Sequence, residues 1–475
     1  MYKSKLIKSF TLLSIFLTVM SCKTPAVVSS TSNQVVPETY SNNKDTTNMS
    51  NIPYKKFFKD KNLQDLIDIA INNNQELMIT LQEIEIAKND IQFKKGRLLP
   101  TVNIAAGAGV EKVGRFTSQG AGDFATQSVE EFPDPLTDFK IAAYANWEVD
   151  VWKKLRNSKK AAVTRYLSTI EGKNFVVTSL VSEVADNYYE LLALDSQLEF
   201  VRQNIKLQTS ALEIVKIQKE AARATELAVQ KFQAEVLASQ NLEFETLQRI
   251  NETENRINFL LGRFPQEIKR DKTEFLSLQP ANVNSGIPSQ LLANRPEIKQ
   301  AELELAAAKL DVKVARAEFY PSLDISAGFG TQAFKTAYLT QFPESMLYSL
   351  VGDIAGPLIN RNAIKAEFKS ANARQLQALY NYERTILNAY LEVATQLSRI
   401  ANLDKSYDLK SKQVESLNKS IDISNDLFKS ARVDYFEVLM TQRDALETKL
   451  ELVDVKKELL NSRVHIYKQL GGGWK

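Results

Sequence analysis

The chain has 475 residues, of which 44% are hydrophobic and 25% are charged, and its formal net charge at pH 7 is +3. This mixed charge predicts no nucleic-acid partner and no strongly acidic partner. A single cysteine, Cys22, and a single histidine, His465, exclude an intrachain disulfide and argue against a metal site built from those ligands. No constellation of nucleophile, base and metal ligands indicates an enzyme, and we expect no cofactor other than a covalent lipid.

The N-terminal segment 1–21 has the pattern of a bacterial lipoprotein signal peptide. Lys3, Lys5 and Lys8 precede a short apolar segment at 10–19, which is too short to span a membrane permanently. The segment ends in Val19-Met20-Ser21-Cys22, which resembles the lipobox, where a peptidase cuts before a cysteine that is then lipidated. Residue Lys23 follows, in place of the aspartate linked to inner-membrane retention. We expect lipid on Cys22 and attachment to the outer membrane; the alternative is an ordinary secretory signal.

The next segments are a polar tether and a first helix. Residues 22–53 are rich in Ser, Thr, Asn and Pro, a composition that predicts a flexible tether after the lipid. Helical spacing of apolar residues begins near Asn62. We expect this helix to end near Leu99, because Pro100 disfavours helical geometry at the residue before it.

After Pro100 the apolar residues recur at every second position, which predicts β-strands. We expect four strands, at about 101–116, 137–150, 322–335 and 345–356. Their length is sufficient to cross a bilayer as tilted strands, and the polar or small second face fits a water-filled lumen. A sheet in a soluble protein with one buried face is the alternative. Four strands cannot close a barrel, so strands in lipid require oligomerisation, with eight strands from a dimer or twelve from a trimer.

Very long helices follow each pair of strands. Residues 155–220 contain no proline, and apolar residues recur there at mixed steps of three and four, as in coiled coils. We expect one helix at 155–220 and a partner helix at 226–261. We expect a second pair of helices at about 361–429 and 434–470. At 1.5 Å per residue the longer helices would each reach roughly 90–100 Å. These lengths favour a rod or tube over a single globular core.

The two halves of the chain share a sequence pattern. Asn73, Glu83 and Pro100 recur as Asn294, Glu304 and Pro321, with the same spacing in both copies and no gap between them. A repeat unit this long indicates a duplicated half-protein and not a solenoid. We therefore expect a first structural repeat at 54–265, a linker at 266–287 and a second repeat at 288–475.

Several motifs, in this order and spacing, resemble the TolC superfamily of outer membrane channels, and in particular its NodT-like lipoprotein branch that serves resistance-nodulation-division efflux pumps. The resemblance covers the chain after Cys22. The motifs are Trp147-Glu148-Val149-Asp150-Val151-Trp152, the stretch from Phe259 to Pro265, Asn294-Arg295-Pro296-Glu297-Ile298, Phe319-Tyr320-Pro321-Ser322, Gly356-Pro357-Leu358-Ile359-Asn360 and the ending Leu470-Gly471-Gly472-Gly473-Trp474.

The resemblance implies a mainly α fold with a membrane β-barrel. It implies a homotrimer with a twelve-stranded β-barrel, four strands per protomer, continued by a long periplasmic α-helical barrel with a mixed equatorial region near the linker. The implied function is a passive outer membrane channel of a tripartite efflux system, with an iris-like periplasmic gate. The implied partners are a periplasmic adaptor protein, an inner-membrane pump of the resistance-nodulation-division type and outer membrane lipid.

The resemblance also assigns residues at the two breaks between long helices. It implies that the hairpin tips contact the adaptor, and we carry this role onto six residues: Arg223, Thr225, Glu226, Arg432, Val433 and Asp434. Asp434 and Glu437 match the ring of acids at the closed end, whereas Met440 occupies the position of the family's further acid. Glycine is common in these turns, but this chain has alanine or valine there. Helix capping by solvated turn residues is the alternative role.

Two other functions remain open at this level. The same fold serves as the outer membrane duct of type I protein secretion, and a coiled-coil lipoprotein scaffold without a pore would share the long helices. The lipobox and the Gly-Gly-Gly-Trp ending favour efflux.

Overall fold

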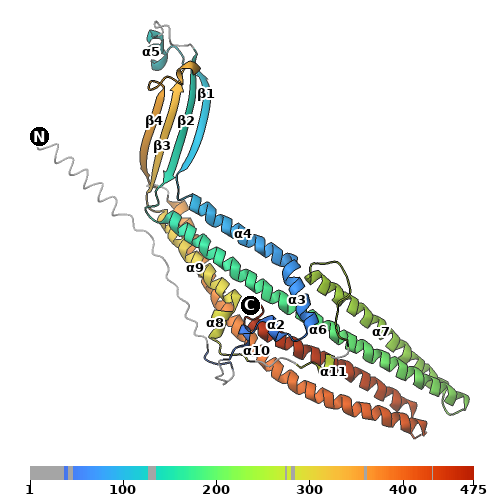
Figure 1. Ribbon diagram of the computed structural model, residues 1–475. Coiled ribbons are helices and arrows are strands. Elements are labelled where there is room, and N and C mark those ends of the chain that lie inside the picture. The colour runs from blue at the N-terminus through green and yellow to red at the C-terminus, as the bar shows by residue number, and fades with distance from the viewer. Residues whose placement is uncertain are drawn as a thin grey trace. The chain divides into compact units, whose positions relative to one another are not determined.

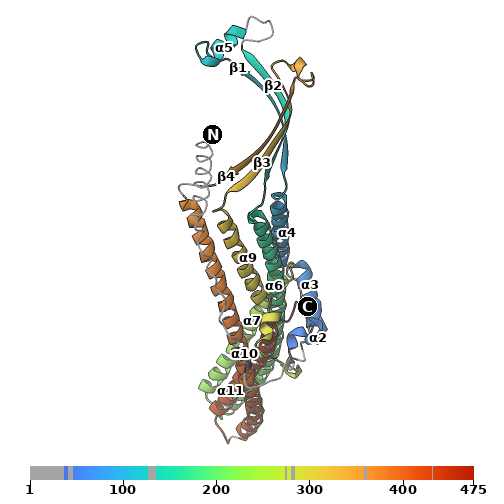
Figure 2. The same ribbon diagram turned by 90° about the vertical axis from the view of Figure 1, so that its left-hand side faces the viewer.

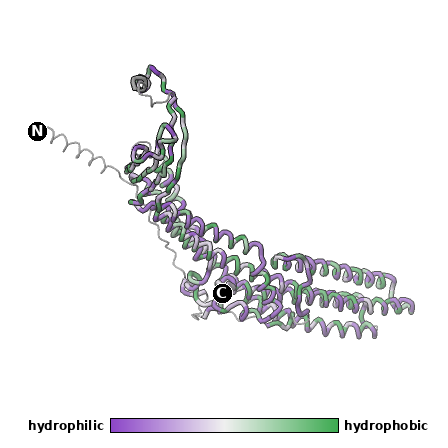
Figure 3. The backbone as a smooth tube through the Cα atoms, turned by 45° about the horizontal axis from the view of Figure 1, so that its top comes forward, coloured by the Kyte–Doolittle hydropathy of each residue, from purple (hydrophilic) through white to green (hydrophobic). Residues whose placement is uncertain are grey.

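The computed structural model describes residues 37–40, 47–126, 135–272, 275–279, 284–357, 361–430 and 432–474 (Figure 1). The expected signal peptide and Cys22 lie outside the described residues. The described part of the chain divides into two compact units, and each takes segments from both halves of the sequence. One unit holds residues 85–167 and 303–380, and the other holds 33–84, 168–302 and 381–475. Among the described residues, no helix is long and apolar enough to cross a membrane, and Figure 3 shows hydrophilic and hydrophobic residues mixed along the helices.

The first unit is built around one antiparallel sheet of four strands, β1 (Thr101–Glu111), β2 (Leu136–Glu148), β3 (Ser322–Ala333) and β4 (Met346–Ala355). The strands lie side by side in chain order (Figure 1), and the sheet is curved (Figure 2). β1 ends before the expected position 116, because its last residue, Glu111, already pairs with the first residue of β2, Leu136. Helix α5 (Ser118–Thr126), which the sequence did not indicate, and helix η3 (Thr336–Tyr338) lie in the connections.

The register sorts the side chains of the sheet onto two contrasting faces. Directly paired residues share a face, and one row across all four strands is Ile104, Ala143, Phe329 and Tyr348. The neighbouring row consists of Asn103, Tyr144, Gly328 and Ser349. One face is therefore apolar from β1 to β4, and the other is mostly polar or small, with Leu347 and Val351 of β4 as exceptions. The alternation in the sequence predicted this division.

The four long helices agree closely with their expected bounds. They are α6 (Lys154–Glu220), α7 (Glu226–Leu260), α10 (Asn362–Lys429) and α11 (Tyr435–Gln469). In the first hairpin, Glu190 of α6 pairs with Arg249 of α7. At the equivalent positions of the second hairpin, Arg399 of α10 pairs with Glu458 of α11. Both hairpins therefore have an ion pair at this position, but the acid is on the longer helix in the first hairpin and on the shorter helix in the second.

The first expected helix is instead two helices, α3 (Lys61–Asn73) and α4 (Gln75–Gly96). Asn74 causes the break, because its side-chain oxygen accepts a bond from Leu77 N at 3.0 Å and its amide donates to Leu260 O at 3.0 Å. The second repeat has the same break between α8 (Gln290–Asn294) and α9 (Pro296–Ala317). Arg295 occupies the position of Asn74 there.

Two glycines end the long hairpins in the same way. Gly262 follows α7 with φ +64°, and Gly471 follows α11 with φ +90°. A Cβ on Gly262 would overlap the carbonyl oxygen of Asn73, and one on Gly471 would overlap that of Asn294. Both the left-handed backbone and the close approach require glycine.

The short elements connect the N-terminal segment and the linker to the second unit. They are η1 (Met49–Asn51), α2 (Tyr54–Phe57) and η2 (Phe275–Ser277). The expected flexible tether reaches too far, because Met49 is 2% exposed and its N–H donates to Asn284 O at 3.0 Å. The expected tether therefore ends before Met49, because this apolar side chain is buried although the segment around it is polar.

In the first unit, helix α9 packs on the start of α10. Phe319, just after α9, lies edge-to-face against Phe368 of α10, with ring centroids 5.8 Å apart. Arg361 donates to Phe319 O at 2.8 Å. Trp152 stacks on Tyr320 at 4.7 Å, so two of the expected motifs meet in this unit.

A buried ion triad ties the linker to the first hairpin within the second unit. The guanidinium of Arg270 donates to Asp195 of α6 at 3.0 Å and to Glu254 of α7 at 2.5 Å. The side chains of Arg270 and Asp195 are 2% and 5% exposed. A buried carboxylate without its cation is strongly unfavourable, so Arg270 fixes the linker in place.

We predict that Arg270→Met lowers the free energy of unfolding by about 3–5 kcal/mol, because it leaves Asp195 buried and unpaired. Chemical unfolding of the purified protein, followed by its helical circular dichroism, measures this loss. The control is Arg249→Met: Arg249 is half exposed and Glu190 keeps Lys457 as a second partner at 2.9 Å, so the loss costs at most about 1 kcal/mol. Equal losses in the two variants would show that the triad has no special role.

Candidate functional site

The turn between α6 and α7 is closed by its own backbone. Arg223 N donates to Gln218 O at 2.8 Å, and Ala222 N donates to Lys219 O at 2.9 Å. This pairing is a Schellman motif, which normally has glycine in its left-handed position. Here the left-handed residue is Ala222, with φ +56°. Thr225 then caps α7, because its hydroxyl accepts a bond from Ala228 N at 3.2 Å.

The described residues of the turn between α10 and α11 share one backbone bond with the first turn. Arg432 N donates to Leu427 O at 2.9 Å, which matches the bond that Arg223 N makes at the equivalent position of the first turn. Asp434 occupies the capping position of Thr225, but its side chain makes no capping hydrogen bond. The structure therefore leaves the carboxylate of Asp434 available for another role.

The two turns also differ in how their acids are paired. Glu226 forms an ion pair with Lys219 and accepts a bond from Gln230 Nε2 at 2.7 Å. The ammonium of Lys219 and the amide of Gln230 hold the pKa of the exposed Glu226 carboxyl below its usual value. Among the described residues, neither Asp434 nor Glu437 has an ion-pair partner. The acid at the first turn is therefore held in an ion pair, and among the described residues the two acids at the second turn are not.

A groove on the second hairpin brings the expected gate residues together. It encloses about 460 Å³ next to the turn, and Asp434 and Glu437 both line it. Asp444, which the sequence analysis missed, is a third carboxylate in the same groove. The signal for it was available, since 437 and 444 are two helical turns apart and therefore lie on one helix face. Met440, which occupies the position of the family's further acid, does not line the groove.

The two hairpins pack together near their turns, and their ends lie side by side in Figures 1 and 2. Leu439 of α11 joins a buried cluster with Val215 of α6 and Phe232 of α7. Lys231 of α7 lies over the ring of Phe436, 5.4 Å from its centroid. The six expected tip residues therefore belong to one composite end of the second unit. Arg223, Thr225, Glu226, Arg432 and Asp434 are exposed there, and Val433 is partly buried.

The polar face of the sheet is the other candidate surface. Near one end of the strands, Glu148, Asp324 and Asp353 lie in one row across β2, β3 and β4. Like charges directly opposite one another destabilise a sheet unless water screens them. Glu148 is paired with Lys154, and Asp324 accepts a bond from Ser322 Oγ at 2.8 Å. A row of three ionisable side chains fits a face in contact with water and not with lipid. Among the described residues, no cluster of His, Cys, Asp and Glu could hold a metal ion.

Comparison with known proteins agrees with this geometry. The model of the family described as "Outer membrane efflux protein" matches residues 66–263 and 287–472. The pyoverdine export outer membrane protein OpmQ of Pseudomonas aeruginosa is 29% identical over 420 residues, which cover 88% of this chain and 87% of that protein. The probable outer membrane lipoprotein SilC of Salmonella typhimurium is 24% identical over 421 residues, covering 89% and 88%.

The fold is likewise that of a solved outer membrane channel. The open state of the MtrE channel of Neisseria gonorrhoeae superposes with a TM-score of 0.83 at 21% identity, covering 95% of this chain and 98% of that one. The expected fold class, a long helical barrel with a β-barrel, is therefore confirmed, and so is the outer membrane as the location.

We predict that Thr225→Ala lowers the stability of the first turn of α7 by about 1 kcal/mol, because it removes the capping bond to Ala228 N. Asp434→Ala removes no such bond, so the stability of the first turn of α11 should change by no more than a few tenths of a kcal/mol. Hydrogen exchange at the amides of Ala228 and Glu437 measures the two effects. Equal acceleration at both amides would contradict the difference between the turns.

Proposed function

The chain belongs to the outer membrane efflux protein family and is an outer membrane channel of an efflux system; from this premise we propose how it works. We propose that it is a passive duct for drugs or other small solutes, open to water along its axis and performing no covalent chemistry. The observation that carries this proposal is the sheet, whose apolar and polar faces continue across all four strands. An apolar outside and a wet inside are the two faces that a channel wall needs.

We propose that the working unit is a homotrimer. Within the described chain the sheet has two outer strands, β1 and β4, and neither pairs with the other. Lipid does not tolerate such edges, because their backbone N–H and C=O groups would lack partners. Closure with β1 of one protomer against β4 of the next satisfies both edges. Three copies would then give the twelve strands that the resemblance to the superfamily implies.

The hairpin ends supply the proposed contacts with the rest of the pump. We propose that Arg223, Thr225, Glu226, Arg432, Val433 and Asp434 meet a periplasmic adaptor protein, which links the channel to an inner-membrane pump of the resistance-nodulation-division type. Exposure of five of these six side chains at one composite end supports this role. Cys22 is proposed to carry the lipid that tethers the chain to the outer membrane.

The acidic groove is the proposed periplasmic gate. Three copies of Asp434 and Glu437 around a narrow axis would concentrate negative potential and attract cations. The absence of a cationic partner for either residue among the described side chains supports this proposal. Asp444 in the same groove would extend the acidic surface by two helical turns from Glu437.

Reconstitution tests the duct and the trimer together. We expect the purified mature protein in lipid nanodiscs to have the mass of three chains, and in planar bilayers to conduct ions. A monomer that stays in solution without detergent, and that gives no conductance, would contradict both proposals.

We predict that the double variant Asp434→Asn with Glu437→Gln weakens the block of single-channel current by divalent cations about two- to tenfold, because it removes negative potential at the gate. Cation selectivity should fall in the same recordings. Glu447→Gln, an exposed acid on the same helix that does not line the groove, is the matched control. If the block is unchanged in the double variant, the two acids are not part of the gate.

A further inference from the structure

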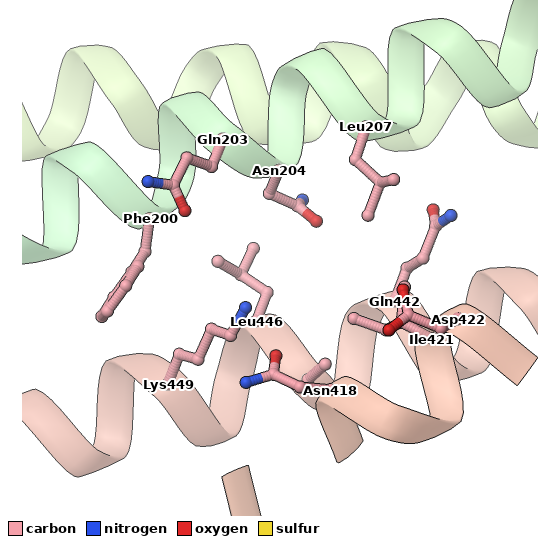
Figure 4. Close-up of a pocket in the computed structure, with 11 residues that line it drawn as sticks. Phe200, Gln203, Asn204, Leu207, Asn418, Ile421, Asp422, Gln442, Leu446 and Lys449 are labelled. Atoms are coloured by element: carbon pink, nitrogen blue, oxygen red, sulfur yellow. The ribbon is translucent and has the colours of Figure 1, made fainter. Parts of the chain in front are cut away.

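A cavity of about 390 Å³ lies between the two hairpins of the second unit. Helix α6 forms one wall, and α10 and α11 form the other (Figure 4). Its volume falls in the range of small-molecule sites in proteins. The residues that carry the argument are Phe200, Leu207, Asp422, Gln442, Leu446 and Lys449. This cavity does not include the turn residues or the acidic groove.

Gln442 is a buried amide without a partner. Its side chain is on the cavity wall, and the residue is 1% exposed. Neither its amide nitrogen nor its amide oxygen has a hydrogen-bond partner among the described residues. A buried donor and a buried acceptor that form no hydrogen bond lower the stability of the fold. This position therefore needs a group that both donates and accepts a hydrogen bond. A hydroxyl, whether of water or of a ligand, satisfies both atoms.

Lys449 brings a positive charge into the same cavity. It is half-buried, and burial lowers the pKa of its ammonium. Its described neighbour is the ring of Phe200, 5.7 Å from the ammonium nitrogen, and the described residues give it no carboxylate. In Figure 4 its ammonium points into the space between α6 and α11. An anion placed there would compensate the charge that the protein leaves unpaired.

The two polar groups lie at opposite ends of a mixed stretch, in which Leu207 and Leu446 supply apolar surface and Gln203, Asn204 and Asn418 supply amides. Gln442 and Lys449 are two helical turns apart, which is about 10.5 Å along the helix axis. Leu446 of α11 lies between them, and Asn204 and Leu207 of α6 are on the opposite wall, with Leu207 on the side of Gln442 (Figure 4). Asp422 stands beside Gln442 and disfavours an anion at that end. A matching ligand therefore has a carboxylate at one end, an apolar body and a hydroxyl at the other end.

We propose that this cavity binds a small hydroxy-carboxylate with an apolar body. Its carboxylate pairs with the ammonium of Lys449, and its hydroxyl donates to Oε1 and accepts from Nε2 of Gln442. The body packs on Leu207 and Leu446. Because the ligand touches α11 and α6, which belong to different hairpins, it bridges the two hairpins. The cavity shares no lining residue with the acidic groove proposed as the gate.

The test uses three rigid probes on the full mature channel in nanodiscs, with binding measured by isothermal titration calorimetry. 4-Hydroxycinnamate carries both end groups, cinnamate lacks the hydroxyl, and 4-hydroxycinnamamide lacks the charge. We expect 4-hydroxycinnamate to bind once per protomer and each of the other two probes to bind roughly tenfold more weakly or worse. Empty nanodiscs correct for partition of the probes into lipid.

Two variants assign the end groups. Lys449→Met should weaken the binding of 4-hydroxycinnamate roughly tenfold or more. Gln442→Leu should abolish the preference for 4-hydroxycinnamate over cinnamate, an effect that a merely structural role would not produce. Lys412→Met, an exposed lysine of α10 outside the cavity, should change neither affinity.

Three outcomes would overturn the proposal: no binding of 4-hydroxycinnamate by the unaltered channel, unchanged affinity in the Lys449 variant, or an unchanged hydroxyl preference in the Gln442 variant. The first would mean that water alone fills the cavity. Conductance recorded on the same preparations separates this result from a failure of the channel itself.

Discussion

The two unpaired edges of the four-stranded sheet constrain everything else in this protein. Each backbone N–H or C=O group left without a partner in hydrocarbon costs several kcal/mol, so an open sheet does not remain open in a membrane. The apolar face that runs from Ile104 to Tyr348 requires lipid, and the edges β1 and β4 require other strands. Both requirements are met only when identical protomers close a barrel. The hollow interior of a channel follows from that closure.

The long helices continue the hollow structure beyond the sheet, and they do so without one large hydrophobic core. Their seams combine small clusters of apolar residues with ion pairs between helices, such as Glu190 with Arg249 and Arg399 with Glu458. The buried triad around Arg270 then fixes the linker against the first hairpin. The seam between the hairpins is less completely packed, and it leaves the polar cavity beside Gln442.

Duplication explains the architecture, and the two copies diverge at the turns for which we propose a functional role. Gly262 and Gly471 keep one packing arrangement in both halves, because only glycine fits against the neighbouring carbonyl oxygen. The turns have diverged instead. Thr225 uses its side chain to cap its own helix, whereas Asp434 leaves its carboxylate unpaired at the equivalent position. A polar group released from a structural role in only one copy is a sign of a role outside the fold.

The sequence by itself determined the strands, the long helices and the duplication, because these depend on local periodicity and on residues such as Pro100 and Gly471 that end elements. It also located both hairpin turns, including Asp434. Only the tertiary structure decided which distant groups meet: the break at Asn74, the triad of Arg270 and the cavity lined by Gln442 join segments that no periodic pattern relates. Local patterns fix backbone geometry within a few turns, whereas burial and pairing arise from segments brought together across the whole chain.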